Sequence, residues 1–149
     1  MGETVVGEVT TWCSVKSPLS YKSFAKDKKE LLKRLKDDPD LQRMSRGERT
    51  YTANSGRNPT AQVALLQQAL YAIGLLDVSA QKSASEDCWM FKFQWGIYTD
   101  ATKKAVAELQ EYARVQGGER GRKFGKATLK ALKTAVESGK KGAAVRLAF

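Results

Sequence analysis

Apolar residues recur every three or four positions along the second half of the chain, which is the spacing of one face of an α-helix. Three helices are predicted from this pattern. The first occupies about 59–73 and ends at Gly74, the second starts near 99–100, and the third runs from about Lys126 to Gly139. Helices this short bury their apolar faces only by packing together. The apolar positions are Val63, Leu66, Leu70 and Ile73, then Ala105, Val106, Leu109 and Tyr112, and finally Leu129, Leu132 and Val136.

The first 58 residues have a more mixed pattern. A short strand is predicted near the N-terminus, followed by a helix whose apolar face includes Leu31 and Leu35 and whose other face is rich in lysine and arginine. Asp38-Pro39 is expected to end this helix. Residues 45–60 have the composition of turns and a linker.

Between the first two helices of the second half lies the segment CWMFKFQWG, residues 88–96, in which aromatic residues alternate with others. Alternation places successive side chains on opposite faces of a β-strand, so the aromatic side chains would share one face. One interpretation is a β-hairpin whose aromatic face covers the helical core, because a bare strand of this kind is prone to aggregate. The alternatives are an exposed platform on which sugar rings stack and an edge that docks a partner. The aromatic residues are Trp89, Phe91, Phe93 and Trp95.

Charge and residue types narrow the choice of function. The 149 residues include 26 Lys and Arg against 16 Asp and Glu, giving a formal net charge of +10. A basic surface attracts nucleic acid, anionic lipid or an anionic wall polymer. The chain has no histidine and two cysteines, Cys13 and Cys88, which argues against a histidine-dependent nucleophile and a zinc site. We expect no metal and no cofactor, and two buried thiols, with a single disulfide as the alternative.

The N-terminal sequence MGETVVGEVTTW lacks a basic region followed by a long apolar run, so no Sec signal peptide is predicted. No stretch approaches the roughly 20 apolar residues that a membrane-spanning helix needs. If the protein acts in the cell envelope or outside the cell, we expect it to arrive by another route, after a cytoplasmic stage.

Three segments of the second half resemble the three-helix peptidoglycan-binding domain, a family found in cell-wall hydrolases and in phage and secretion-system proteins. The segments are QVALLQQALYAIGLL, GIYTDATKKAVAELQ and GRKFGKATLKAL, and they match in order and spacing over about 56–138. The matched residues are Val63, Leu66, Gln67, Leu70 and Gly74, then Gly96, Tyr98, Thr102, Ala105, Val106, Leu109 and Gln110, and finally Gly121, Gly125, Thr128 and Leu132.

The resemblance implies that most motif residues serve the fold. The repeated unit of glycine, aromatic residue and threonine is a turn that leads into a helix, and the apolar members are expected in the core. Gln67 and Gln110 are expected to tie helix ends to loops rather than to contact sugar. The chain departs from the family pattern at Thr99, which replaces a glycine, and at Trp95 and Arg120, which replace the aspartate before each motif glycine.

The predicted fold is therefore mainly α. A three-helix bundle like that of the peptidoglycan-binding family would carry a β-hairpin or long loop insertion and an α/β N-terminal extension. The expected domains are 1–58, with a short strand, a basic helix and a linker, and 59–149, with the helical domain and an apolar C-terminal tail.

The function that the resemblance implies is non-catalytic binding of peptidoglycan, through its stem peptide and nearby glycan. Lysine and arginine would attract the carboxylates of the stem peptide. Delivery by a phage particle, a holin-type lysis route or a contractile injection system would suit a chain without a Sec signal. The chain could also be a fragment of a larger hydrolase. The expected contacts at the two motif turns are Tyr98, Thr99, Asp100, Arg122 and Lys123.

Three other functions stay open. A structural or adaptor protein of a virion or secretion apparatus would bind another protein through residues 1–58 or the tail AAVRLAF. A nucleic-acid binder would suit the charge, but the basic residues are spread along the chain and no familiar motif is found. A wall hydrolase needs two carboxyl groups that flank the scissile bond. The close acidic pairs in the wall-binding region are Glu86 with Asp87 and Glu108 with Glu111, the latter expected on a solvated helix face.

Overall fold

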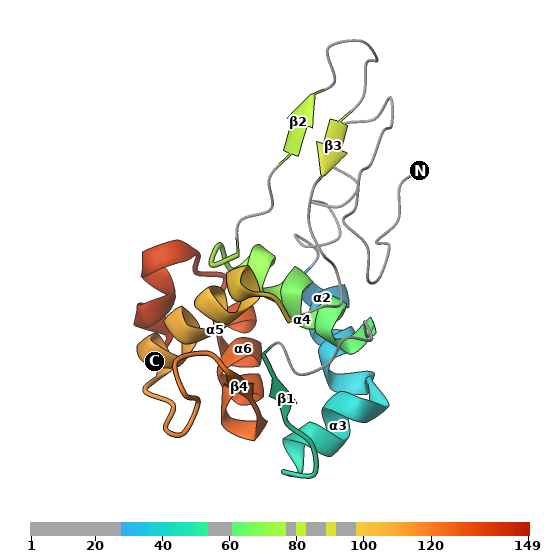
Figure 1. Cartoon of the computed structure of the whole chain (residues 1–149), viewed down its shortest axis with the longest axis vertical. Coiled ribbons are helices and arrows are strands. Elements are labelled where there is room, and N and C mark those ends of the chain that lie inside the picture. Colours follow the sequence, from blue (N-terminus) through green and yellow to red (C-terminus); the bar gives the residue numbers. More distant parts are fainter. Residues whose placement is uncertain (1–27, 54–60, 77–79, 83–88, 92–97) are drawn as a thin grey trace.

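The computed structural model describes residues 28–53, 61–76, 80–82, 89–91 and 98–149, and this part of the protein is mainly helical, as predicted. Helix α6 is the central element, because α2, α3, α4, α5 and the C-terminal 3-10 helix η1 all pack against it (Figure 1). The helices are α2 (Lys28–Asp37), α3 (Pro39–Ser45), α4 (Ala61–Ala72), α5 (Asp100–Ala113), α6 (Lys126–Ser138) and η1 (Gly142–Ala148).

The three helices predicted in the second half are present with the predicted faces. Gly139 lies directly after α6, and Gly74 lies two residues after the end of α4. Their φ angles are 73° and 75°, the left-handed conformation expected of a glycine at a helix end. Every predicted apolar position is buried except Tyr112, which is half-buried against the core. Helices α4, α5 and α6 also contact one another, so their apolar faces meet.

The chain between residues 38 and 53 is more ordered than its sequence indicates. The predicted helix ends at Asp37, but α3 begins at Pro39, where a proline needs no hydrogen-bond partner for its nitrogen. The Asp38 carboxylate caps α3 by accepting from the backbone N–H groups of Asp40 and Leu41, at 2.9 and 3.1 Å. Asp38-Pro39 thus ends one helix and starts another.

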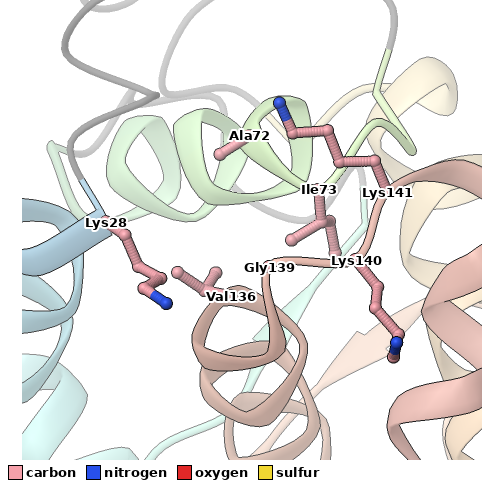
Figure 2. Close-up of a pocket in the computed structure, with 7 residues that line it drawn as sticks. All are labelled: Lys28, Ala72, Ile73, Val136, Gly139, Lys140 and Lys141. Carbon is pink, nitrogen blue, oxygen red and sulfur yellow. The ribbon is translucent and has the colours of Figure 1, made fainter.

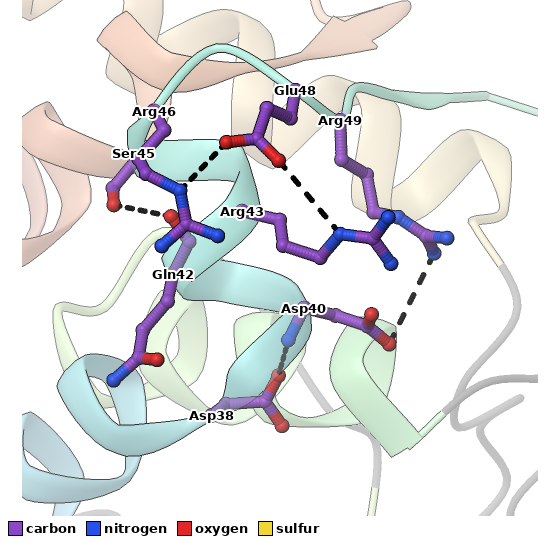
Figure 3. A network of polar contacts seen from close by, with 8 residues as sticks. All are labelled: Asp38, Asp40, Gln42, Arg43, Ser45, Arg46, Glu48 and Arg49. Carbon is purple, nitrogen blue, oxygen red and sulfur yellow. Dashed lines mark hydrogen bonds and ion pairs between the residues drawn. The ribbon is translucent and has the colours of Figure 1, made fainter.

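A polar network follows α3 (Figure 3). The Glu48 carboxylate lies 2.6 Å from the Nε atom of Arg46 and 4.0 Å from that of Arg43, while Arg49 lies 4.0 Å from Asp40. The hydrogen bond from Arg46 lowers the pKa of Glu48. The arginines and Glu48 are exposed and Asp40 is half-buried, and ion pairs at the surface contribute little stability. We interpret the network as the structure that turns the chain from α3 toward β1.

Strand β1 (Tyr51–Thr52) corrects the prediction that 45–60 is only turn and linker. It pairs antiparallel with β4 (Lys123–Phe124), with Tyr51 opposite Phe124 and Thr52 opposite Lys123. The Ala53 N–H extends the pairing by donating to the Arg122 carbonyl at 2.7 Å. The sequence gives no sign of this pairing because strands of two residues have no periodicity to detect.

The helices on either side of the predicted domain boundary share one core. Leu31 and Leu35 of α2 and Leu41 and Met44 of α3 are at most 1% exposed, and they belong to the same buried cluster as the apolar residues of α4, α5 and α6. The boundary itself, at residue 58, lies outside the described residues, as does the predicted N-terminal strand.

The predicted hairpin insertion is present as two short strands. Strand β2 (Ala80–Lys82) pairs antiparallel with β3 (Trp89–Phe91), with Ala80 opposite Phe91 and Lys82 opposite Trp89. In Figure 1 the two strands stand away from the helices rather than over them, contrary to the interpretation of a flap that covers the helical core. Phe93 and Trp95 lie outside the described residues.

Candidate functional site

A hydrogen bond from a glutamine to a threonine side chain joins α4 to α5, and a second bond of the same kind joins α5 to α6. The Gln67 amide of α4 donates to the hydroxyl of Thr102 in the first turn of α5, at 2.9 Å. The Gln110 amide of α5 donates to the hydroxyl of Thr128 in the first turn of α6, at 3.0 Å. All four side chains are at most 5% exposed. Each glutamine directly follows a buried leucine. The chain therefore contains twice the combination of a Leu-Gln step in one helix and a threonine at the start of the next.

Gln110 also holds the loop between α5 and α6. Its amide nitrogen donates to the Lys123 carbonyl at 2.7 Å, and its amide oxygen accepts from the Gly121 N–H at 2.9 Å. Gly118 approaches so closely that a Cβ atom there would lie 2.4 Å from the Gln110 amide. The expectation that a glutamine ties a helix end to a loop thus holds for Gln110. Gln67 instead contacts the first turn of the next helix, α5.

Gly121 lies directly against the backbone of α5. Its φ angle is 88°, and a Cβ atom would fall 2.0 Å from the Lys103 carbonyl oxygen and 2.8 Å from the Ala107 nitrogen. The Tyr98 hydroxyl donates to the Gly121 carbonyl, so the turn before α5 is bonded to the turn before α6. Burial raises the pKa of Tyr98, which keeps this hydroxyl protonated as a donor.

The predicted contact residues divide between the interior and the surface. Tyr98 is only 5% exposed and faces the core, so its role is to join the two motif turns rather than to meet a ligand. Thr99 is half-buried, and its hydroxyl lies 3.3 Å from that of Thr102. Asp100 and Arg122 are exposed. The Lys123 ammonium is exposed too, and it lies 3.3 Å from the Glu119 carboxylate.

The other residues predicted from the sequence have no described side chain at the motif turns. Trp89 and Phe91 lie in β3, away from the motif turns (Figure 1). Cys13 and Cys88 are outside the described residues, so the choice between thiols and a disulfide stays a prediction. Glu108 accepts from the Tyr112 hydroxyl at 2.9 Å, which is a contact within α5.

A pocket at the far end of α6 was not predicted from the sequence. It has a volume of about 200 Å³ and lies between the start of α2, the end of α4 and the link from α6 to η1 (Figure 2). Three lysines and three apolar residues line it together with Gly139. No spacing pattern could have found it, since its lysines lie at opposite ends of the sequence. The lysines are Lys28, Lys140 and Lys141, and the apolar residues are Ala72, Ile73 and Val136.

Among the described residues, no group of three or more acidic, cysteine or histidine side chains is placed to hold a metal ion. None of the helices in this part of the chain is both long enough and apolar enough to span a membrane.

Comparisons of the whole chain with protein-family models, with curated proteins and with solved structures found no match.

Proposed function

We propose that this chain is a non-catalytic module that binds peptidoglycan, with the stem peptide and nearby glycan as its ligand. The proposal starts from the three linked segments that resemble the peptidoglycan-binding family. The observation that carries it is the repeated contact of Gln67 with Thr102 and of Gln110 with Thr128. The glutamine and the threonine that recur in the family pattern thus form the same contact between two helices twice in this chain. This is what we expect if α4, α5 and α6 form the three-helix bundle of that family.

The binding surface in this proposal consists of the exposed side chains at the two motif turns. Arg122 is the main candidate, because a guanidinium binds a carboxylate through two parallel hydrogen bonds. Within the described residues it forms no ion pair with a carboxylate. The Lys123 ammonium lies 3.3 Å from the Glu119 carboxylate, so it would have to leave that carboxylate or contact the carboxylate and the ligand together. Thr99 and Asp100 offer a hydroxyl and a carboxylate to sugar hydroxyls and peptide N–H groups.

The arrangement of the acidic residues in this region supports binding of the wall without its cleavage. A glycosidase needs one carboxylic acid and one carboxylate on opposite sides of the scissile bond. Glu108 and Glu111 lie three residues apart on α5, and Glu108 already accepts a hydrogen bond from Tyr112. Such a pair is typical of a solvated helix face.

The cell envelope or the extracellular space would be the place of action, reached by a phage particle, a lysis route or a contractile injection system. A second candidate function is that of a structural or adaptor protein in a virion or secretion apparatus. One observation favours it: Leu147 and Phe149 of the C-terminal tail are 65% and 48% exposed. Exposed apolar side chains close together can dock a protein partner.

Cosedimentation with purified sacculi at low and high salt tests the proposal, together with an assay for soluble wall fragments. We expect binding that weakens with salt but persists, since screening acts on the exposed charges and not on shape or hydrogen bonding. Soluble fragments released in proportion to the protein added would instead indicate a hydrolase. Recovery of a protein partner without any wall binding would favour the adaptor.

A further inference from the structure

The pocket at the end of α6 combines positive charge with an apolar surface. Figure 2 shows Lys28 and Lys141 reaching toward this surface from opposite sides, while Lys140 points away. The apolar surface is formed by Ala72 and Ile73 of the α4 end and by Val136 of α6. We call the site formed by Lys28, Lys141 and these three residues the lysine pocket.

Among the described residues, no carboxylate forms an ion pair with the lysines of the lysine pocket. Lys28 donates to the Glu137 carbonyl at 3.2 Å, which leaves two of its three ammonium protons for other partners. Lys28, Lys140 and Lys141 form no ion pair within the described part of the chain. Clustered cations without counter-charges raise the local concentration of anions.

The carbonyl groups at this end of the helices do not cancel that charge. Helix C-termini carry partial negative charge on carbonyls that have no partner. Here the Val136 carbonyl accepts from the Gly139 N–H at 3.2 Å, and the Ile73 carbonyl accepts from the Gly142 N–H at 2.8 Å. Lys28 covers the Glu137 carbonyl. Donors therefore already occupy these three carbonyls.

More cations lie along the neighbouring surface where α2 meets α6. Burial lowers the pKa of Lys133, and the nearby ammonium of Lys36 lowers it further. Two lysines of different helices thus lie close enough to repel each other, one turn of α6 away from Val136.

The size and lining of the lysine pocket restrict the ligand further. Its volume of about 200 Å³ is below the roughly 300–1,000 Å³ of pockets that hold drug-sized molecules. The apolar side chains provide a surface for a short alkyl group, which a bare inorganic anion does not have. Lysine is a point charge with three donors and does not require the planar, two-oxygen geometry that arginine selects.

We propose that the lysine pocket binds a small aliphatic carboxylate. The carboxylate would lie between the ammonium groups of Lys28 and Lys141, with the alkyl group on Ile73 and Val136. The same chemistry has two sources, a free short-chain acid and the C-terminal end of a peptide. The site is separate from the motif turns, because it lies at the C-terminal end of α6, whereas the turns directly precede α5 and α6. It therefore does not depend on the proposed wall binding.

Titration of the ¹⁵N-labelled full chain, followed by amide chemical shifts, tests this site. N-acetylalanine should shift the amides of Ile73 and of Gly139 to Lys141, with a dissociation constant of about 1–10 mM for so small a ligand. The uncharged N-acetylalaninamide should cause no comparable shifts. Acetyl-alanyl-alanine then distinguishes the sources: tighter binding than N-acetylalanine assigns a peptide end, and weaker binding assigns a free acid.

Three lysine variants complete the test. Lys28→Gln and Lys141→Gln should each weaken binding about two- to fivefold, as expected for exposed charge contacts. Lys104→Gln, on the exposed face of α5, is the matched control with the same change in charge and should leave binding unchanged. The amide spectra show at once whether each variant is folded. Equal binding of the amide, equal binding of inorganic phosphate, or unchanged binding in both pocket variants would overturn the proposal.

Discussion

The buried amide of Gln110 donates to the hydroxyl of Thr128 at 3.0 Å, and the same amide group holds the loop between these residues from both of its polar atoms. Three contacts from one side chain fix the Gly121 N–H, the Lys123 carbonyl and the first turn of α6. Since Arg122 lies between two of these points, Gln110 sets the backbone that presents Arg122 to solvent. A residue of the interior thus positions the proposed ligand contact.

Replacing Gln110 by alanine should destabilise the protein by about 1–3 kcal/mol, because buried polar groups lose their partners. The matched control is Gln42→Ala, in which an exposed amide loses a contact with the Lys36 carbonyl, and it should change stability by less than about 0.5 kcal/mol. Chemical denaturation followed by far-UV circular dichroism measures both. Equal stability of the two variants would show that the Gln110 contacts are not needed.

Gly121 and Gly117 form a second matched pair. Both have positive φ angles, 88° and 75°, but a Cβ atom meets the α5 backbone at Gly121 and open space at Gly117. Gly117→Ala should cost about 1–2 kcal/mol from backbone strain alone. Gly121→Ala should cost about 3–5 kcal/mol, because α5 and the loop must move apart as well. Unfolding free energies that differ by less than 1 kcal/mol (about the strain term itself) would contradict the close approach.

Leu31→Ala tests whether α2 belongs to the common core. Leu31 is fully buried, so its truncation should reduce the free energy of unfolding of the whole protein by about 2–5 kcal/mol. Leu147→Ala is the exposed control and should have an effect within about 0.5 kcal/mol. Thermal unfolding monitored by calorimetry should show a single transition that shifts as a whole. A separate low-temperature transition in Leu31→Ala would mean that α2 and α3 unfold on their own.

Tyr98 should make stability depend on alkaline pH. Burial raises the pKa of its hydroxyl above the ordinary value of about 10, so the folded state keeps a proton that the unfolded chain has lost. Its contribution is complete below about pH 10 and decreases as pH rises through the folded-state pKa. The decrease in unfolding free energy between about pH 9 and 11 should be steeper in the natural protein than in Tyr98→Phe. Identical slopes would mean that Tyr98 ionises freely in the folded state.

The helical spacing of apolar residues predicted much of this fold, because those residues are the ones that the fold buries. The faces containing Val63, Leu66 and Leu70 in α4, or Leu129 and Leu132 in α6, repeat over several turns, and burial follows that repeat. The short elements β1 and α3 were missed because two to seven residues are too few for a period. Their formation depends on distant partners, such as Phe124 opposite Tyr51.

The candidate site was predicted only in part. The motif identified the two turns and the glutamines that hold them, and the exposure of Arg122 agrees with a role in contact. The motif did not distinguish Tyr98, which is buried, from its exposed neighbour Asp100. The lysine pocket could not be predicted at all, because Lys28 and Lys141 come together only when α2 and the end of α6 pack.

The double variant Arg122→Ala/Lys123→Ala should bind sacculi about three- to thirtyfold more weakly, as expected for the loss of two exposed charge contacts. Its thermal stability should stay close to that of the natural protein. The control is Lys29→Ala/Lys33→Ala, which removes the same charge from the exposed face of α2 and should bind almost normally. Equal weakening in both double variants would mean that net charge, and not the motif turns, governs the attachment.

The amount of folded protein that sediments with purified sacculi at low salt, compared with the amount that sediments with cellulose, tests the central claim most directly. Cellulose offers sugar rings without stem peptides, so it controls for adhesion to an insoluble polysaccharide. We predict saturable sedimentation with sacculi and almost none with cellulose. Folded protein that stays in the supernatant with sacculi, or sediments equally with both, would contradict the proposal that this chain binds peptidoglycan.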